Sequence, residues 1–231
     1  MARRREPEWD EIMAAAARLQ RIVPDAVLVG GTAAAVHAGH RVSFDDDHTV
    51  EDLKARFDDV LGALEETDGW VTARVARPVQ VLGSLDGVET GIRNLIRRRP
   101  LETELHPTPH GPIRVPTLAE MARIKAWLVL RRNATRDYLD LVAVAERLGP
   151  DAAGVLVGLD EWYADQIGPG GERVATQLAK QLAEPRPYDL SEVDLPRYRR
   201  LNARWHDWLA VADACRTLAV AMLDRIAEED P

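Results

Sequence analysis

The sequence predicts an α+β protein, with a mixed sheet flanked by helices and then a bundle of C-terminal helices. Up to about residue 116, short apolar or alternating segments interleave with a few amphipathic helical segments, and beyond that point only helical periodicity is found. The strand-like segments follow one another through short turns, which indicates a mixed sheet rather than repeated parallel βαβ units. We therefore expect an α/β core over residues 1–116 and a helical domain over residues 117–231.

Helix and turn signals alternate through the first 66 residues. Apolar positions spaced by three and four predict a helix over residues 8–22, which Pro24 ends. Residues 26–29 are an apolar run typical of a buried strand. Gly30-Gly31 permit a sharp turn into a helix over residues 33–38, which Thr32 would cap. Residues 42–48 are expected to be extended, and residues 50–66 are expected to form another helix.

Period-two alternation begins after Gly69 and predicts a run of strands. The expected strands cover residues 70–75, 79–85, 88–96, 101–106 and 113–115. Asp86-Gly87 predicts a tight hairpin between the second and the third of these strands.

Helices are expected in the rest of the chain. Thr117 and Glu120 have the spacing of a capping box for a helix to about residue 131, and Asn133 could cap a helix to about residue 148. Further helices are expected over residues 152–166 and 171–182. From residue 201 an apolar seam repeats at intervals of four and three, and we expect it to pack on the other helices. Trp205 and Trp208 belong to this seam, which favours core packing over stacking on nucleic-acid bases.

The composition is that of an ordinary globular protein, with 46% hydrophobic and 29% charged residues. The single cysteine excludes an internal disulfide, and Arg3-Arg4-Arg5-Glu6 is not followed by the apolar segment of a secretory signal. We expect a cytoplasmic protein with no membrane span, because no run of about 18 apolar residues occurs. A net charge of −8 argues against a general duplex binder, although Arg97-Arg98-Arg99 and Arg131-Arg132 could form local basic patches.

One stretch combines a glycine turn, a hydroxyl residue and an acidic pair. Gly30-Gly31-Thr32 would stand at a helix start, where backbone N–H groups and the helix dipole bind phosphate oxygens. Asp45 and Asp47 are two apart, so on a strand they point to the same face. Two neighbouring carboxylates repel each other unless a cation neutralises them, and oxygen ligands suit Mg²⁺ or Mn²⁺. The stretch predicts a site for a nucleotide and a divalent metal.

A second polar group spans residues 125–140. Lys125 lies on an apolar helix face, which is unusual for a lysine unless it meets an anion or reaches solvent. Arg136, Asp137 and Asp140 follow, with Asp137 and Asp140 in the first turns of the next helix. The segment is either an anion-binding group or a structural ion-pair network between two helices.

The histidines near the acidic pair permit another interpretation. His37, His40 and His48 could join Asp45 and Asp47 in a tight Zn²⁺ site or a hydrolytic metal site. We favour a different role, in which His40 and Arg41 orient the carboxylates or contact phosphate.

The two segments together resemble the AbiEii/AbiGii-type nucleotidyltransferases, the toxin family of certain bacterial toxin–antitoxin and phage-abortive systems. Gly30-Gly31-Thr32, then His40-Arg41 and Ser43, then Asp45-Asp46-Asp47 resemble the first motif of that family. Lys125, an arginine seven residues later and Arg136-Asp137-x-x-Asp140 resemble a later motif. The matches bracket about residues 27–141, and the C-terminal helices carry no matching residue.

The resemblance implies a polymerase-β-like nucleotidyltransferase fold and an enzyme that transfers a nucleotide from an NTP to an RNA or protein acceptor, tRNA being one candidate. It implies Asp45 and Asp47 as the Mg²⁺ or Mn²⁺ ligands. It implies that the nucleotide is bound by Gly30, Gly31, Thr32, Arg41, Ser43, Lys125 and Arg136. Asp137 would lie near the acceptor as a base, or would orient Lys125. A cognate antitoxin is implied by the family alone.

A third carboxylate would separate an active enzyme from an inactive one. Nucleotidyltransferases of this fold often carry it on a later strand, where this chain offers only Glu89. The alternative function is therefore a catalytically silent nucleotidyltransferase-like module that binds or regulates.

Overall fold

The computed structural model describes residues 5–167 and 170–229, which divide into two compact units. The α/β unit comprises the chain up to Ala33 together with Val42–Thr117. The helical unit comprises Ala34–Arg41 and the chain from Leu118 onward. The predicted domain limits put residues 34–41 in the α/β core, whereas the structure groups them with the helices. Residues 1–4, which hold part of the N-terminal arginine run, lie outside the described residues.

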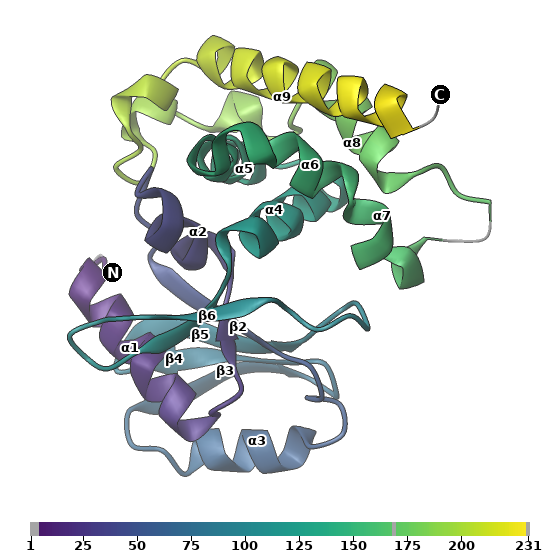
Figure 1. The fold of residues 1–231 in the computed structure, drawn as a ribbon. Helices are drawn as coiled ribbons and strands as arrows, with labels where there is room; N and C mark the ends of the chain where they lie inside the picture. The colour runs from purple at the N-terminus through teal and green to yellow at the C-terminus, as the bar shows by residue number, and fades with distance from the viewer. Residues whose placement is uncertain (1–4, 168–169, 230–231) are drawn as a thin grey trace. The chain divides into compact units, whose positions relative to one another are not determined.

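A five-stranded mixed sheet forms the centre of the α/β unit (Figure 1). Its strand order is β1-β2-β5-β4-β3. Its strands are β1 (Val27–Leu28), β2 (Asp45–Val50), β3 (Trp70–Ala76), β4 (Gln80–Leu85) and β5 (Val88–Asn94). Strands β2 and β5 are parallel, and the other neighbouring strands are antiparallel. Strands β6 (Thr103–His106) and β7 (Ile113–Pro116) form a separate antiparallel pair. The predicted mixed sheet and the Asp86-Gly87 hairpin are confirmed.

One face of the five-stranded sheet is buried under α1 (Trp9–Ile22) and α3 (Phe57–Glu65). Apolar side chains of both helices pack in one cluster with those of the sheet, among them Leu19, Phe57, Leu64, Val81, Leu85 and Ile92. Because side chains alternate along a strand, the residues between these positions point to the other face. That second face carries Asp45, Asp47, Glu89 and Arg93, which are half-buried or exposed.

Two boundaries in this unit differ from the sequence expectation. The helix expected over residues 50–66 covers only Phe57–Glu65, because Val50 ends β2, where it pairs with Asn94. Helix α2 (Gly30–Ala38) begins at Gly30 rather than at residue 33, so the predicted Thr32 cap is wrong and Thr32 lies inside the first turn.

The helical unit contains the end of α2 and the helices from α4 to α9. These are α4 (Leu118–Arg132), α5 (Thr135–Leu148), α6 (Ala152–Val157), α7 (Leu159–Trp162), α8 (Val174–Ala183) and α9 (Trp208–Glu229). Helix α9 packs against α5, α6 and α8 (Figure 1). Its seam residues Ala212, Cys215, Ala219 and Met222 are buried, so the predicted packing of the seam on the other helices is confirmed.

Helix ends in this unit follow backbone geometry that the sequence patterns did not reveal. Asn133 does not cap α5; it has φ of +51° and its N–H donates to the Val129 carbonyl, which closes α4. The N–H and hydroxyl of Thr135 instead donate to a carboxylate from a distant segment, Asp189, each at 2.7 Å. The helix expected over residues 152–166 is broken at Gly158, and the last helix begins at Trp208 after a short 3-10 turn at Ala203–Trp205.

Over residues 5–167 and 170–229, no helix combines the length and the apolar character needed to cross a bilayer.

Candidate functional site

The turn between β1 and α2 lies against the acidic strand. The Val29 N–H donates to the main-chain carbonyl of Asp47 at 2.7 Å. Gly30 has φ of +73°, and a Cβ at this position would lie 3.4 Å from the Cβ of Asp47. Residues other than glycine rarely adopt this backbone conformation, so Gly30 lets the chain turn beside Asp47. The start of α2 is thereby held next to an acidic side chain.

Thr32 fixes the same turn from within α2. Its side chain is fully buried, and its hydroxyl donates to the main-chain carbonyl of Asp45. A phosphate contact by Thr32 would therefore come from its backbone. The N–H groups in the first turn of a helix, which here include those of Gly31 and Thr32, have no acceptor within the helix and can bind an anion.

Asp45 and Asp47 lie on one face of β2, and Asp46 lies on the other. Asp45 and Asp47 are half-buried, whereas Asp46 is fully buried. The Ser43 hydroxyl donates to Oδ1 of Asp45 at 2.7 Å, and Ser43 is itself 1% exposed. Ser43 was predicted to bind the nucleotide; its geometry here is that of a residue that positions the Asp45 carboxylate.

Glu89 occupies the position expected for a third carboxylate. In the parallel register of β2 and β5, Asp45 pairs with Glu89 and Asp47 pairs with Gly91, so Asp45, Asp47 and Glu89 point to the same face. Glu89 is exposed. Over the described ranges, no group of three or more histidine, cysteine, aspartate or glutamate side chains is arranged to hold a metal ion. Glu89 thus shares the face of the pair without completing a three-carboxylate cage.

A guanidinium group also lies on this face. Nη2 of Arg93 is 3.6 Å from Oδ1 of Asp47. On β4, Gln80 pairs with Arg93, and with its amide oxygen turned toward the guanidinium it accepts a hydrogen bond from Nη1 at 2.8 Å. Arg93 was not foreseen as a site residue, because only the strand register shows that it shares a face with Asp47.

The opposite face of β2 holds a buried acid and a buried imidazole. The side chains of Asp46 and His48 are fully buried, and neither the Asp46 carboxyl oxygens nor the His48 ring nitrogens have a hydrogen-bond partner. Burial raises the pKa of Asp46 well above its ordinary value, and the charges of Asp47 and Asp45 add to the rise. Burial lowers the pKa of His48 to about 3. His48 is therefore neutral near pH 7.

The alternative histidine–aspartate metal site is not supported by the positions of His48 and His40. His48 points to the face of β2 opposite Asp45 and Asp47, because it is one residue from Asp47 on a strand. His40 belongs to the helical unit, where its ring is bound to Asp140. His48 therefore cannot join the acidic pair, the His40 ring is engaged with Asp140, and over the described residues no group of three or more such side chains is arranged to hold a metal.

In the helical unit, Asp140 is the centre of a buried ionic network. Nε2 of His40 donates to its Oδ1 at 2.7 Å, and Arg41 donates from Nε at 2.7 Å and from Nη2 at 2.9 Å. Nζ of Lys125 lies 2.7 Å from its Oδ2. Burial raises the pKa of the Asp140 carboxyl, but the charges of Arg41 and Lys125 outweigh burial and hold it well below its ordinary value.

Asp137 lies at the edge of this network. Its Oδ1 is 3.9 Å from Nζ of Lys125, and its Oδ2 is buried without a hydrogen-bond partner. Burial raises the pKa of Asp137, and the charge of Lys125 opposes the rise. Arg136, which was predicted to bind the nucleotide, is exposed on α5. The structural interpretation of this segment, an ion-pair network between α4 and α5, accounts for Lys125 and Asp140.

The predicted site residues therefore fall into two groups. The α/β unit brings together Gly30, Gly31, Thr32, Ser43, Asp45 and Asp47, and the helical unit brings together Arg41, Lys125 and Asp137. Asp140 was noted in the sequence motif but not predicted as a site residue, and it is the residue on which Arg41 and Lys125 converge. Its spacing from Asp137, three residues along a helix, was the available signal.

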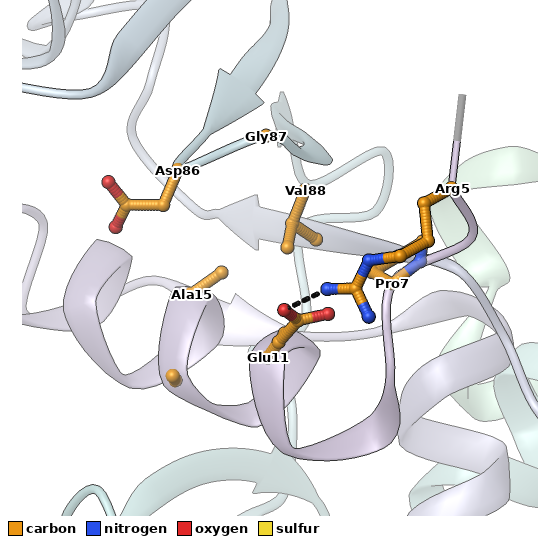
Figure 2. A pocket seen from close by; sticks show the side chains of 8 residues that line it. Arg5, Pro7, Glu11, Ala15, Asp86, Gly87 and Val88 are labelled. Atoms are coloured by element: carbon orange, nitrogen blue, oxygen red, sulfur yellow. Dashed lines mark hydrogen bonds and ion pairs between the residues drawn. The ribbon is translucent and has the colours of Figure 1, made fainter. Parts of the chain in front are cut away.

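A cavity elsewhere in the α/β unit contains none of these residues (Figure 2). It has a volume of about 400 Å³ and lies between the N-terminal segment, α1 and the β4–β5 turn. Arg5 on its wall is hydrogen-bonded to Glu11, as Figure 2 shows. Asp86 is hydrogen-bonded to Arg18 at 2.7 Å. The charged groups at this cavity are thus engaged with one another.

The donor set on β2 fits a magnesium or manganese ion. Mg²⁺ is commonly held by one or two carboxylates, with waters and substrate phosphates as the other ligands. Asp45 and Asp47 supply two carboxylates on one face, and Gly30, which starts α2, lies beside Asp47. The N–H groups at a helix start can bind phosphate. A third protein carboxylate is not required by this coordination chemistry.

Comparisons with known proteins find partial relatives. No protein-family model matches the chain. It is 31% identical over 242 aligned residues to the heme uptake protein MmpL11 of Mycobacterium tuberculosis and to the probable transport protein MmpL11 of Mycobacterium bovis. It is 38% identical over 133 residues to the probable transport protein MmpL11 of Mycobacterium leprae. The first two alignments cover 92% of this chain, which spans only 22% of the length of those relatives.

Two solved structures resemble the chain at low sequence identity. The antibiotic-resistance factor ANT(2'')-Ia is similar over 68% of this chain and 93% of its own, with a TM-score of 0.48 and 12% identity. An antigenic nucleotidyltransferase-like protein from Paracoccidioides brasiliensis is similar over 68% of this chain and 89% of its own, with a TM-score of 0.47 and 14% identity.

Proposed function

We propose that this chain is a metal-dependent nucleotidyltransferase, which transfers a nucleotide from an NTP to an acceptor hydroxyl and releases pyrophosphate. The observation that carries the proposal is the placement of Asp45 and Asp47 on one face of β2, beside the Gly30 turn that starts α2. Carboxylates and helix N–H groups held side by side are the two kinds of group that a metal-bound phosphate needs.

The α/β unit supplies the metal and phosphate contacts in this proposal. Asp45 and Asp47 would hold Mg²⁺ or Mn²⁺, which would supply charge stabilisation during phosphoryl transfer. Ser43 holds the Asp45 carboxylate in place, and the backbone at Gly31 and Thr32 binds phosphate oxygens. Catalysis then comes mostly from positioning and from charge stabilisation.

The helical unit supplies cations. Arg41 and Lys125 carry two positive charges around the Asp140 carboxylate, and Asp137 lies 3.9 Å from Lys125. The assignment of Arg41 and Lys125, together with the exposed Arg136, to nucleotide phosphates rests on the family resemblance. Asp137 is assigned as the base for the acceptor or as a group that orients Lys125.

The resemblance to AbiEii/AbiGii-type proteins supports a finer proposal. In it the chain is the toxin of a toxin–antitoxin or phage-defence system, acts in the cytoplasm on an RNA such as tRNA or on a protein, and is neutralised by a cognate antitoxin.

The direct test is transfer of label from each α-labelled NTP to total RNA or lysate protein in the presence of Mg²⁺ or Mn²⁺. Labelling by the wild type should be abolished by Asp45→Asn and by Asp47→Asn. Asp59→Asn removes one exposed carboxylate from α3 of the same unit and should leave labelling unchanged. Labelling that survives both substitutions on β2 would contradict the site assignment.

The second candidate function is a catalytically silent module that binds a nucleotide and regulates a partner. It is favoured by the alignment of 92% of this chain with 22% of the length of relatives named for transport or heme uptake. In those relatives, such a segment would be one part of a larger protein. This candidate predicts saturable NTP binding by calorimetry without pyrophosphate release. Pyrophosphate release that depends on Asp45 and Asp47 would exclude it.

A further inference from the structure

The two carboxylates of the acidic pair are held by chemically different neighbours. Asp45 accepts a hydrogen bond from the neutral Ser43 hydroxyl at 2.7 Å. Asp47 faces the charged guanidinium of Arg93, with 3.6 Å between Nη2 and Oδ1. A hydroxyl can keep its hydrogen bond when a metal arrives on the carboxylate, whereas a cation repels the metal. At Asp47, an arriving metal therefore meets the positive charge of Arg93.

The strand register explains how Arg93 reaches Asp47. Asp47 pairs with Gly91 on β5, and Arg93 is two residues further on the same face. Gly91 has no side chain to separate them, and a Cβ there would lie 3.7 Å from Oδ1 of Asp47. Gln80 on β4 accepts a hydrogen bond from the guanidinium at 2.8 Å, which steadies Arg93 beside the carboxylate.

The exposure of the two side chains keeps this ion pair exchangeable. The Arg93 side chain is 45% exposed and the Asp47 side chain is 33% exposed. A half-exposed pair at this separation is weak, so a divalent ion can displace the guanidinium without leaving a charge buried. Arg93 can then remain bound to Gln80 or extend into solvent.

We propose that Arg93 is a built-in counter-ion of Asp47, which competes with the divalent metal for this carboxylate and so sets the metal affinity of the site. The inference rests on the proposed function, because it takes Asp45 and Asp47 as the metal-binding pair. In the absence of metal, Arg93 offsets the repulsion among Asp45, Asp47 and Glu89. A nucleoside triphosphate that binds together with the metal brings negative charge, and this charge offsets the positive charge of Arg93. The site therefore favours a metal–nucleotide complex over the free metal.

The test is a titration of the whole chain with free Mn²⁺, followed by electron paramagnetic resonance, with no nucleotide and no activity readout. Arg93→Gln should bind Mn²⁺ about fivefold more tightly than the wild type, as expected from removing one partly screened positive charge. Arg93→Lys keeps the charge and should stay within about twofold of the wild type. Arg74→Gln is the matched control, because Arg74 is an exposed arginine on the same face of the sheet, on β3.

The outcomes separate this inference from the proposed function. Tighter binding by Arg93→Gln alone, abolished when Asp47→Asn is added, supports it. If the wild type binds Mn²⁺ through Asp45 and Asp47 but Arg93→Gln binds equally or more weakly, the competition is refuted and the proposed function stands. If no variant binds Mn²⁺ at millimolar concentration, the metal site itself is refuted and the inference falls with it.

Discussion

The Ser43 hydroxyl donates a 2.7 Å hydrogen bond to Oδ1 of Asp45, and Ser43 is buried while Asp45 is half-buried. A hydroxyl that orients a metal-binding carboxylate commonly contributes to the metal affinity, and its loss lowers that affinity. We therefore expect Ser43→Ala to weaken Mn²⁺ binding by about tenfold while the fold is kept. Ser84→Ala, on β4 of the same sheet face, is the control and should leave the affinity unchanged. Equal affinities for the two variants, measured by the same titration, would show that Ser43 does not act on Asp45.

Asp140 should be the most costly carboxylate to neutralise in the helical unit. Asp140→Asn removes the carboxylate that Arg41 and Lys125 share while both stay buried, and breaking a buried pair in this way costs about 3–5 kcal/mol. The free energy of unfolding, from urea titration, should fall by that amount. Asp151→Asn, at an exposed position in the same unit, should change it by less than about 0.5 kcal/mol. Adding Lys125→Met to Asp140→Asn should recover part of the loss, and a purely additive result would argue against their coupling.

Gly30 and Gly39 form a matched pair for separating backbone strain from contact with the site. Both have positive φ, +73° and +60°, but only a Cβ at Gly30 would meet Asp47. Alanine at either position should lower the free energy of unfolding by about 1–2 kcal/mol. Gly30→Ala should in addition weaken Mn²⁺ binding, whereas Gly39→Ala should not. Loss of binding in both variants would show that strain alone disturbs the site.

His48 should make the protein sensitive to mild acid. Burial lowers the pKa of His48 to about 3 in the folded protein, against an ordinary value of 6.5 in the unfolded chain. Between these two values the unfolded state binds more protons at this residue, so the contribution of His48 to stability falls as the pH is lowered from 6.5 toward 3. The slope reaches about 1.4 kcal/mol per pH unit.

His48→Leu removes this titration and the two unpartnered ring nitrogens. The variant should be more stable than the wild type, and the difference should widen as the pH falls below 6.5. Urea unfolding at pH 7.5, 6 and 5 measures it. A difference that stays constant over these three values would mean that His48 titrates normally in the folded state.

The sequence revealed the parts of the fold that depend on periodicity and on turn chemistry. Strand β4 alternates half-buried and buried positions, and Asp86-Gly87 marks its hairpin with β5, so both strands could be predicted from residue types alone. Boundaries set by tertiary pairing did not follow. The sequence pattern predicts that a helix begins at Val50, but in the structure Val50 pairs with Asn94 and extends β2.

For the candidate site, too, the local features could be predicted from the sequence and the long-range contacts could not. Asp45 and Asp47 were predicted to share one face because side chains on a strand repeat every two residues. The turn at Gly30 was predicted from its two consecutive glycines. The positions of Arg93 and Asp140 depend on contacts over long sequence separations. Arg93 reaches Asp47 from a parallel neighbouring strand, and Asp140 lies 100 residues from His40. No local pattern encodes such contacts.

Helix α2 (Gly30–Ala38) is shared between the two units, and the segment Ala34–Arg41 belongs to the helical unit although it precedes most of the α/β unit in sequence. During synthesis, His40 and Arg41 are therefore made 100 and 99 residues before Asp140, the carboxylate to which both are hydrogen-bonded. A cut between residues 117 and 118 would give a C-terminal fragment without these two partners of Asp140. We expect that fragment to fold only when a peptide containing residues 34–41 is supplied, so the chain is better dissected by complementation than by truncation.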